Sequence, residues 1–240
     1  MQIFLTLLAI AGLSYLIGSI PFGWLVVKLS TGLDVRFIES GRTGGTNVYR
    51  AAGVAAGVIT AILDFFKGAV TVYIARAIFP VAHPLFHWAE ILAPLAAILG
   101  HNYSIYLIET HVTTGKLKLR GGAGGAACLG GSAGLWTGAL PIVLPLVMLV
   151  YFVIGYASLT TMSIALISTL LFLVLAVQGI VPWTYVVYGL AAFTMVVWAL
   201  RPNIQRLREG NERQHGLLPL LKKRAAARRA DEQRGKEKQP

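Results

Sequence analysis

The stretch Glu39-Ser40-Gly41-Arg42-Thr43-Gly44-Gly45-Thr46-Asn47-Val48-Tyr49-Arg50 is a polar island between two apolar segments of membrane-spanning length. Its three glycines leave the backbone free to bend. Glycine-rich backbone can turn successive N–H groups toward one anion, and an arginine can hold a phosphate with two parallel hydrogen bonds. We interpret this stretch as a phosphate-binding loop at a membrane surface. The alternative is a basic loop whose arginines only fix the orientation of the neighbouring spans.

The composition points to a membrane protein. Of the 240 residues, 56% are hydrophobic and only 13% are charged, with a mean hydropathy of +0.68. Soluble domains contain about 25% charged residues, so this chain cannot keep most of its surface in water. The net charge of +11 is concentrated at the end, because 12 of the 21 Lys and Arg residues fall between 201 and 238. We expect anionic lipid headgroups as the partner of this basic tail, and no nucleic acid.

Apolar length and the distribution of positive charge predict an all-α, polytopic membrane helix bundle of about seven transmembrane helices. The basic loops would lie on the cytoplasmic side, which leaves the N-terminus outside and the C-terminus in the cytoplasm. Residues 1–213 would form the membrane domain, and 214–240 a flexible tail or a fraying helix. The expected spans are 3–27, 53–79, 91–107, two spans that divide 125–154 near Gly138, 162–177 and 183–200.

Several polar residues fall inside or beside the expected spans. Asp64 and Lys67 lie on one face of a helix at i and i+3. Charges inside a span usually face the bundle interior or a wet cavity, so this pair either pins two helices together or serves the site. His83 and His87 could suggest a metal, but no zinc-site pattern accompanies them, and we expect a solvated loop and no metal.

The glycine run 121–125 follows a basic loop at 109–120. It lacks the spacing of a dinucleotide-binding fingerprint, and Gly115-Lys116 lacks the Ser or Thr of a P-loop. Two interpretations remain open. The run could let backbone approach a phosphate at a helix N-terminus, or it could allow close packing between helices.

Taken in order, these segments resemble the bacterial acyl-phosphate:glycerol-3-phosphate acyltransferase family, the integral-membrane PlsY type. The resemblance covers about residues 3–213. It is carried by five pieces: Gly18-Ser19-Ile20-Pro21-Phe22-Gly23; Ser40-Gly41 with Gly44, Thr46-Asn47 and Arg50; Asp64 with Lys67-Gly68; Leu99-Gly100-His101-Asn102; and Asn203-Ile204 with Arg206-Leu207, Gly210 and Glu212.

The resemblance implies an enzyme of the plasma (inner) membrane, with its site on the cytoplasmic side. It would transfer a fatty acyl group from acyl phosphate to the 1-hydroxyl of glycerol 3-phosphate, giving lysophosphatidic acid in the first step of phospholipid synthesis. No cofactor is implied. The partners would be these two substrates and the lipid bilayer.

The resemblance also assigns roles to individual residues. The catalytic residues would be Ser40, Arg50 and Asn203. The phosphates would be bound by Gly41, Gly44, Thr46, Asn47, Arg120, Gly121, Gly122 and Gly124. Supporting positions would be Asp64, Lys67, His101, Asn102 and Glu212.

The chain departs from the family pattern at four positions. Ala123 stands where the family has lysine, Leu200 where it has histidine, Arg42 where it has asparagine, and Gly155 where it has arginine. About ten extra residues precede Gly121. Arg42, Lys116 or Lys118 could supply the missing cation. The alternative function is a divergent family member, with an altered acceptor or no activity, that binds phosphate-bearing lipid precursors.

Overall fold

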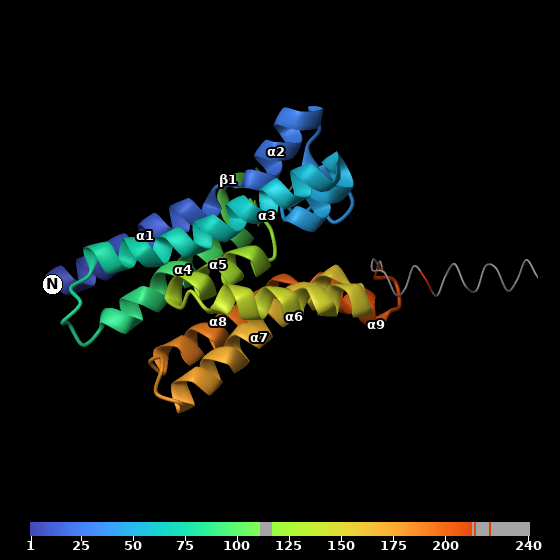
Figure 1. Ribbon diagram of the computed structural model, residues 1–240. Helices are drawn as coiled ribbons and strands as arrows, with labels where there is room; N and C mark the ends of the chain where they lie inside the picture. Colours follow the sequence, from blue (N-terminus) through green and yellow to red (C-terminus); the bar gives the residue numbers. More distant parts are fainter. Residues whose placement is uncertain (111–116, 213, 215–220, 222–240) are drawn as a thin grey trace, which may run out of the picture.

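We describe the protein from a computed structural model, which covers residues 1–110, 117–212, 214 and 221 (Figure 1). Lys116 and nearly all of the predicted basic tail lie outside the described residues. The described chain is mostly helical, which confirms the predicted helix bundle. The all-α prediction missed one element, a two-stranded hairpin.

The first predicted span is broken in two. Instead of one helix over 3–27, the structure has α1 (Gln2–Ser19) and α2 (Phe22–Thr31). Proline cannot donate a backbone hydrogen bond and disfavours a helical conformation at the residue before it, and the break falls at Ile20-Pro21. A short 3₁₀ turn, η1 (Val35–Phe37), follows α2 and leads into the polar island.

The polar island is half helical, which its glycines did not indicate. α3 (Gly45–Ile78) begins inside it and bends at Gly53, where φ is +86°. Residues 45–52 then fold back along the next turns of α3, because a Cβ at Gly45 would lie 2.8 Å from the carbonyl oxygen of Gly57. The start of the second predicted span thus coincides with the bend at Gly53.

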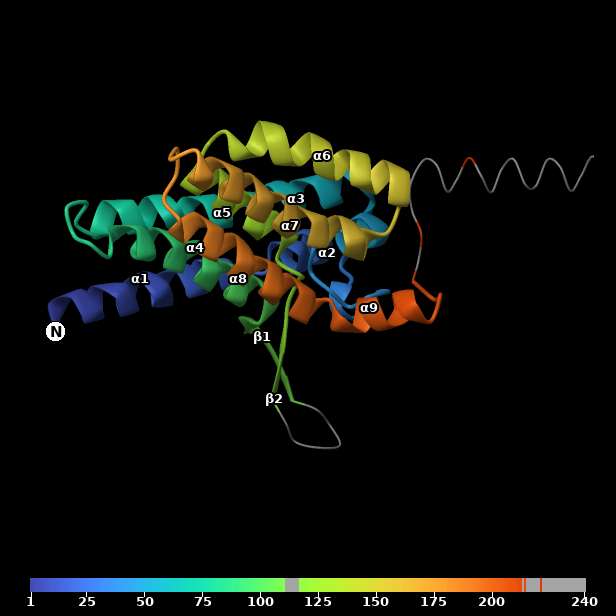
Figure 2. The same ribbon diagram turned by 90° about the horizontal axis from the view of Figure 1, so that it is seen from below.

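α4 (Phe86–Asn102) is followed directly by the hairpin, so the third predicted span, 91–107, ends five residues too late. The strands are β1 (Ser104–Thr110) and β2 (Leu117–Arg120), paired antiparallel with an irregularity between Ser104 and Ile108. Figure 2 shows the hairpin projecting from the side of the bundle, across the direction of the helix axes.

Between residues 117 and 212, the described chain forms five helices. The predicted division near Gly138 is confirmed, because it separates the first two of them. Gly155 ends the second with φ of +78°, and the third begins at Ala157, earlier than the predicted 162. These helices are α5 (Gly125–Leu135), α6 (Ala139–Ile154), α7 (Ala157–Val177), α8 (Thr184–Ala199) and α9 (Arg201–Arg208).

Small residues bring the central helices together. α5 is buried along nearly its whole length and packs against α3. A Cβ at Gly130 would overlap the carbonyl oxygen of Phe65, and one at Gly68 would overlap that of Ala127. α1 packs on α4 in the same way, through Gly18 and Gly100. Glycine thus brings these backbones close without a side chain between them, as is common in membrane helix pairs.

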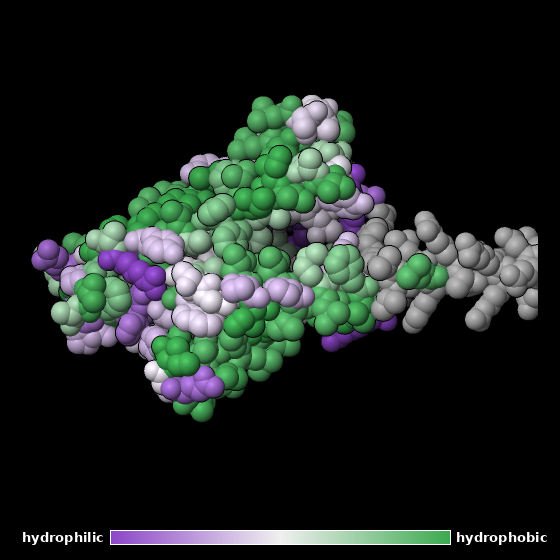
Figure 3. Space-filling model, viewed as in Figure 1, coloured by the Kyte–Doolittle hydropathy of each residue, from purple (hydrophilic) through white to green (hydrophobic). Residues whose placement is uncertain are grey.

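The outer surface is suited to lipid. Figure 3 shows a face that is mostly hydrophobic, with hydrophilic residues gathered mainly toward the two ends of the view. Within the described residues, three segments are long and apolar enough to cross a membrane, and a fourth counts if α8 and α9, bent by 63°, form one span. The three segments are Gln2–Thr31, Gly45–Ile78 and Ala157–Val177. The count of seven spans and the orientation of the termini stay predictions.

Candidate active site

One cavity gathers residues from the polar island and from the region of α9. Its volume is about 190 Å³. All three residues that the sequence assigned to catalysis, Ser40, Arg50 and Asn203, line it, although about 150 residues separate the last from the others. The full lining is Glu39, Ser40, Arg50, Asn203, Arg206, Asn211 and Glu212. A larger groove, of about 370 Å³, is lined by Arg201, Ile204, Gln205 and Arg208 and contains none of the predicted site residues.

The α9 side of the cavity is held by one carboxylate. Asn203 and Arg206 are three residues apart on α9, so their side chains share a face. Both donate to Glu212, with Asn203 Nδ2 3.0 Å from Oε1 and Arg206 Nε 3.3 Å from Oε2. Glu212 therefore orients an amide and a guanidinium toward the same space.

Two buried polar atoms of the cavity residues are left for a ligand. Within the described part of the chain, neither Arg50 Nε, a donor, nor Asn203 Oδ1, an acceptor, has a hydrogen-bond partner. Buried polar groups are almost always paired in folded proteins. The cavity residues thus hold one cationic donor and one neutral acceptor with unused hydrogen-bonding capacity, which suits a ligand carrying both an anionic group and a hydroxyl.

Asn47 organises the island loop. Its side-chain Nδ2 donates to the carbonyls of Ile38 at 3.0 Å and Arg42 at 2.9 Å, and Oδ1 accepts from the Ser40 N–H at 3.4 Å. Gly41 turns the same loop with φ of +66°, a conformation that favours glycine. Asn47 was predicted to bind phosphate, but its amide group is already occupied in shaping the loop that presents Ser40.

Arg42 ties the island to two other segments. Its Nη1 donates to the carbonyl of Gly122 at 3.0 Å, and its Nη2 donates to the carbonyl of Ala199. Burial lowers the pKa of this guanidinium from its usual value, and repulsion from the positive charge of Arg206 lowers the pKa further. The sequence suggested Arg42 as a replacement phosphate-binding cation. Instead, these two nitrogens bind backbone carbonyls, so Arg42 joins the loops that surround the site.

The glycine turn before α5 packs against the end of α4. A Cβ at Gly122 would overlap the imidazole of His101, and the Gly122 N–H donates to the His101 carbonyl at 2.9 Å. Gly121 accepts from the Thr43 N–H at 3.3 Å, and Gly124 begins α5 with φ of +86°. The N–H of Gly122 is thus already paired with protein, and the predicted contact of Gly122 with a phosphate stays a prediction.

Of the predicted supporting residues, Glu212 lines the cavity, whereas Asp64, Lys67, His101 and Asn102 lie outside its lining. Lys67 Nζ is 2.8 Å from Asp64 Oδ1, and both side chains are buried. His101 Nδ1 approaches the same carboxylate oxygen at 3.5 Å. Lys67 also donates to the carbonyl of Ile20 at 3.1 Å, in the break between α1 and α2. Asn102 is buried beside this group, and its amide has no partner within the described residues.

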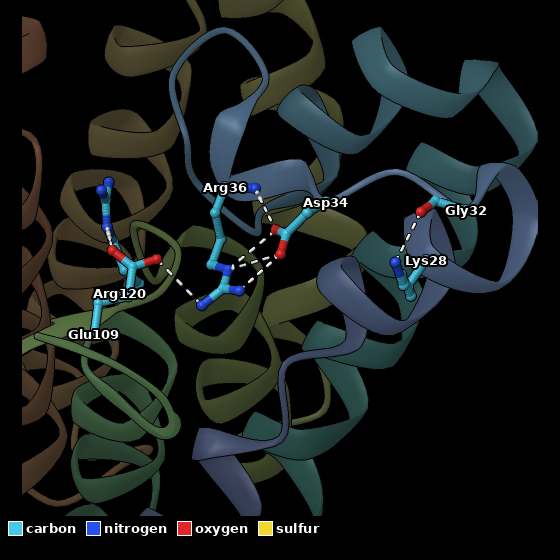
Figure 4. Close-up of polar contacts among 6 residues, drawn as sticks. All are labelled: Lys28, Gly32, Asp34, Arg36, Glu109 and Arg120. Atoms are coloured by element: carbon cyan, nitrogen blue, oxygen red, sulfur yellow. Dashed lines mark hydrogen bonds and ion pairs between the residues drawn. The ribbon is translucent and has the colours of Figure 1, made fainter.

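A chain of ion pairs attaches the hairpin to η1 (Figure 4). Arg36 lies 2.7 Å from Asp34 and 3.1 Å from Glu109, and Glu109 also accepts from Arg120 Nε at 2.8 Å. The guanidinium of Arg36 holds the pKa of Asp34 well below its usual range. Arg120 was predicted to bind phosphate, but it does not line the cavity, and its Nε serves this network.

Three cavity residues were not predicted from the sequence, and some predicted site residues lie outside the cavity lining. The residues not assigned to the site are Glu39, Arg206 and Asn211. Arg206 could have been predicted, because it follows Asn203 by three residues, and residues at that spacing share a helix face. Thr46 is exposed on the first turn of α3 and does not line the cavity. Gly44 is the residue before that turn and also lies outside the lining.

The solvated loop expected around His83 is shorter than predicted, because His87 and Glu90 lie on α4, where Glu90 pairs with Arg76 of α3. Glu90 is only 2% exposed, and it accepts from Arg76 Nε at 2.6 Å. His87 Nδ1 lies 2.6 Å from the same carboxyl group. No group of three or more metal-ligating side chains occurs among the described residues.

The chain is similar to known proteins along most of its length. The model of a family described as glycerol-3-phosphate acyltransferase matches residues 8–210. The chain belongs to this family. A glycerol-3-phosphate acyltransferase of Thermus thermophilus is 36% identical over 210 residues, covering 85% of this chain and 92% of the relative. Glycerol-3-phosphate acyltransferase 3 of Dehalococcoides mccartyi is 33% identical, covering 86% and 94%.

Solved structures of this acyltransferase family share the fold. A crystal structure of PlsY, an integral membrane glycerol 3-phosphate acyltransferase, in its glycerol 3-phosphate form matches with a TM-score of 0.73 at 29% identity. It covers 90% of this chain and 98% of PlsY. The lysophosphatidic acid form matches with a TM-score of 0.71 at 28% identity. This chain is accordingly a membrane protein of the acyltransferase family.

Proposed function

We propose that this protein transfers a fatty acyl group from acyl phosphate to the sn-1 hydroxyl of glycerol 3-phosphate. The hydroxyl oxygen attacks the acyl carbonyl carbon, and the bond from that carbon to the phosphate oxygen breaks. Lysophosphatidic acid and inorganic phosphate are the products. The hydroxyl proton passes to a phosphate oxygen of the substrate, so the protein need not supply a base for this step.

The observation that carries this proposal is the chemistry of the 190 Å³ cavity. Arg50 and Arg206 suit the phosphate of glycerol 3-phosphate, since guanidinium groups bind phosphate through charge-assisted hydrogen bonds. Asn203 Oδ1, which lacks a partner within the described residues, suits a glycerol hydroxyl. Ser40 and Asn203 line the same small cavity, so a small polyol phosphate can contact both.

We place the site on the cytoplasmic side of the plasma (inner) membrane. The loops that build it, 28–50, 117–124 and 199–212, carry many of the described lysines and arginines, and positive loops are retained in the cytoplasm. Acyl phosphate would approach from the bilayer, because the outer surface of the helices is apolar. The basic end of the chain would bind anionic headgroups on the same side.

The test is an assay of the purified full-length protein. Acyl phosphate and glycerol 3-phosphate are added to the protein in phospholipid vesicles, and lysophosphatidic acid is measured by mass spectrometry. We expect product from the unmodified chain and from Arg208→Lys, whose side chain is exposed outside the cavity. We expect Ser40→Ala and Asn203→Ala to lose activity.

The assay also decides between the two candidate functions. Binding of glycerol 3-phosphate without product would favour a divergent member that only holds phosphate-bearing precursors. Binding without product could arise because Ala123 stands where the resemblance places a lysine, so one cation of the family's site is missing. If Ala123→Lys then gave product, the defect would be one missing cation. If neither form bound or turned over glycerol 3-phosphate, the proposal would be wrong.

A further inference from the structure

The hairpin β1–β2 has one charged face and one apolar face. Ile108 is paired with Leu119 and Thr110 with Leu117, while Glu109 is paired with Lys118. Residues opposite each other in an antiparallel pair share a face, and successive residues alternate between faces. One face therefore carries Ile108, Leu117 and Leu119, and the other carries Glu109 and Lys118.

The apolar face is bare. The exposed fractions of Ile108, Leu117 and Leu119 are 46%, 73% and 39%. At the base of the hairpin, Ile105 and Tyr106 are exposed by 42% and 56%. An unpartnered apolar strand face in water is an aggregation hazard that proteins normally avoid, so this face requires an occupant.

The charged face is turned toward the loop after α2. Glu109 binds Arg36 of η1 at 3.1 Å and Arg120 of its own hairpin at 2.8 Å (Figure 4). These contacts fix which way the hairpin faces, because the apolar residues must point away from η1. η1 lies in the polar segment that follows α1 and α2, and that segment leads on to the cavity residue Ser40.

The base of the hairpin is fixed at the ends of two helices. Ser104 Oγ donates to the carbonyl of Ser19, the last residue of α1, at 2.5 Å. Tyr15 donates to the carbonyl of Tyr103, just after α4, at 2.8 Å. From there the hairpin runs sideways, across the helix axes (Figure 2). The hairpin thus leaves the bundle where α1 and α4 end and runs across their direction, as expected of a segment that lies along the membrane surface.

We propose that the hairpin is seated in the headgroup region of the bilayer, with Ile108, Leu117 and Leu119 toward the acyl chains. α1, to whose last residue the hairpin is anchored, also exposes apolar side chains, among them Leu13 and Leu16. Lys118, on the opposite face, lies at headgroup level and binds anionic phosphate groups. Tyr106 at the base has the amphipathic ring that is favoured at membrane interfaces. Amphipathic helices at the membrane interface are arranged in the same way, with the apolar face toward the acyl chains and the polar face toward the headgroups.

Neighbouring residues on opposite faces give a matched test. Leu117→Cys and Lys118→Cys are each labelled with an environment-sensitive fluorophore in the full chain, in vesicles of phosphatidylglycerol and phosphatidylcholine with brominated acyl chains. The unmodified chain measures background labelling, because Cys128 is buried. We expect a blue-shifted emission quenched by bromine for the label at 117, and a weaker shift and weaker quenching for the label at 118.

Other outcomes would overturn the proposal. Water-like emission at both positions would mean that the hairpin stands clear of the bilayer. A blue shift at 117 without quenching by brominated lipid would mean that protein covers this face, for example a second copy of this chain. Unfolding midpoints of the labelled variants check that the fold is retained. The readout is independent of acyltransferase activity, so it stands apart from the proposed function.

Discussion

Arg42 shows how one side chain can define a site without lining it. Its guanidinium donates to the carbonyl of Gly122 before α5 and to that of Ala199 at the end of α8. Arginine suits this task, because its planar fork presents several donors in fixed directions, whereas lysine is a single point charge. The two carbonyls belong to segments that flank Ala123 and Leu200, so the departures at 42, 123 and 200 meet at one place.

Replacing Arg42 by lysine is expected to loosen the site while keeping the charge. A lysine can reach one of the two carbonyls, so one charge-assisted hydrogen bond is lost, at a cost of about 1.5–3 kcal/mol. If that loss falls on the transition state, kcat/KM for lysophosphatidic acid formation drops by roughly ten- to a hundredfold. Arg208→Lys is the matched control, and equal rates for the two variants would remove the role given to Arg42.

The buried ion pair of Asp64 and Lys67 is a second case in which single side chains connect several segments, here inside the helix bundle. Removing one member leaves the other as an uncompensated buried charge, whereas replacing both is often tolerated. The carboxylate also faces His101, and the ammonium also holds the carbonyl of Ile20. The pair therefore links α3 to the end of α4 and to the break after α1.

We expect Lys67→Met to destabilise the protein by about 3–5 kcal/mol. The double variant Asp64→Asn, Lys67→Met should recover part of that loss, since no buried charge is left alone. Thermal unfolding in detergent, followed by circular dichroism, measures both. A double variant that is less stable than Lys67→Met would show that the ionic contacts themselves stabilise the fold.

At the scale of elements, the glycines of α3 and α5 decide how closely the two helices approach. α5 is only 11 residues long and buried almost completely, so its position depends on this contact more than on its own helix propensity. The carbonyl of Phe65 occupies the space that a Cβ on Gly130 would need. A rigid backbone cannot move aside as a flexible side chain can.

Gly130→Ala is therefore expected to destabilise the protein by about 1–3 kcal/mol, the usual cost of overpacking. Gly12→Ala in α1 is the matched control, because nothing lies within 4 Å of the added methyl group. That change should be neutral or stabilising by about 0.5–1 kcal/mol, since alanine favours a helix over glycine. Both are measured as shifts in the thermal midpoint, and a tolerated Gly130→Ala would contradict the packing argument.

At the scale of the molecule, two distant segments line one cavity and a third is attached beside them. The island supplies Ser40 and Arg50, the glycine turn is tied in through Arg42, and the α9 region supplies Asn203, Arg206 and Glu212. Residues that hold one substrate together act as a unit, so their mutational effects on rate do not add.

We expect Ser40→Ala and Asn203→Ala to behave in this way. Each should lower kcat/KM, and the double variant should lose little more than the more damaging single variant. The acyltransferase assay measures all three rates. Losses that multiply fully in the double variant would show that the two residues act independently, which is not expected of two residues that line one cavity.

The sequence alone determined that this is a membrane helix bundle and which polar segments matter. Hydrophobic runs and charge bias are local properties, so they can be read along the chain. Ser40, Arg50 and Asn203 were singled out by the resemblance to the acyltransferase family, whose motifs are also short and local. Only the tertiary structure decided that Asn47 and Arg42 shape the site, that Gly122 packs on His101, and that a hairpin projects from the side of the bundle. Those outcomes depend on which carbonyls and side chains meet across the fold, and no local pattern in the chain carries that information.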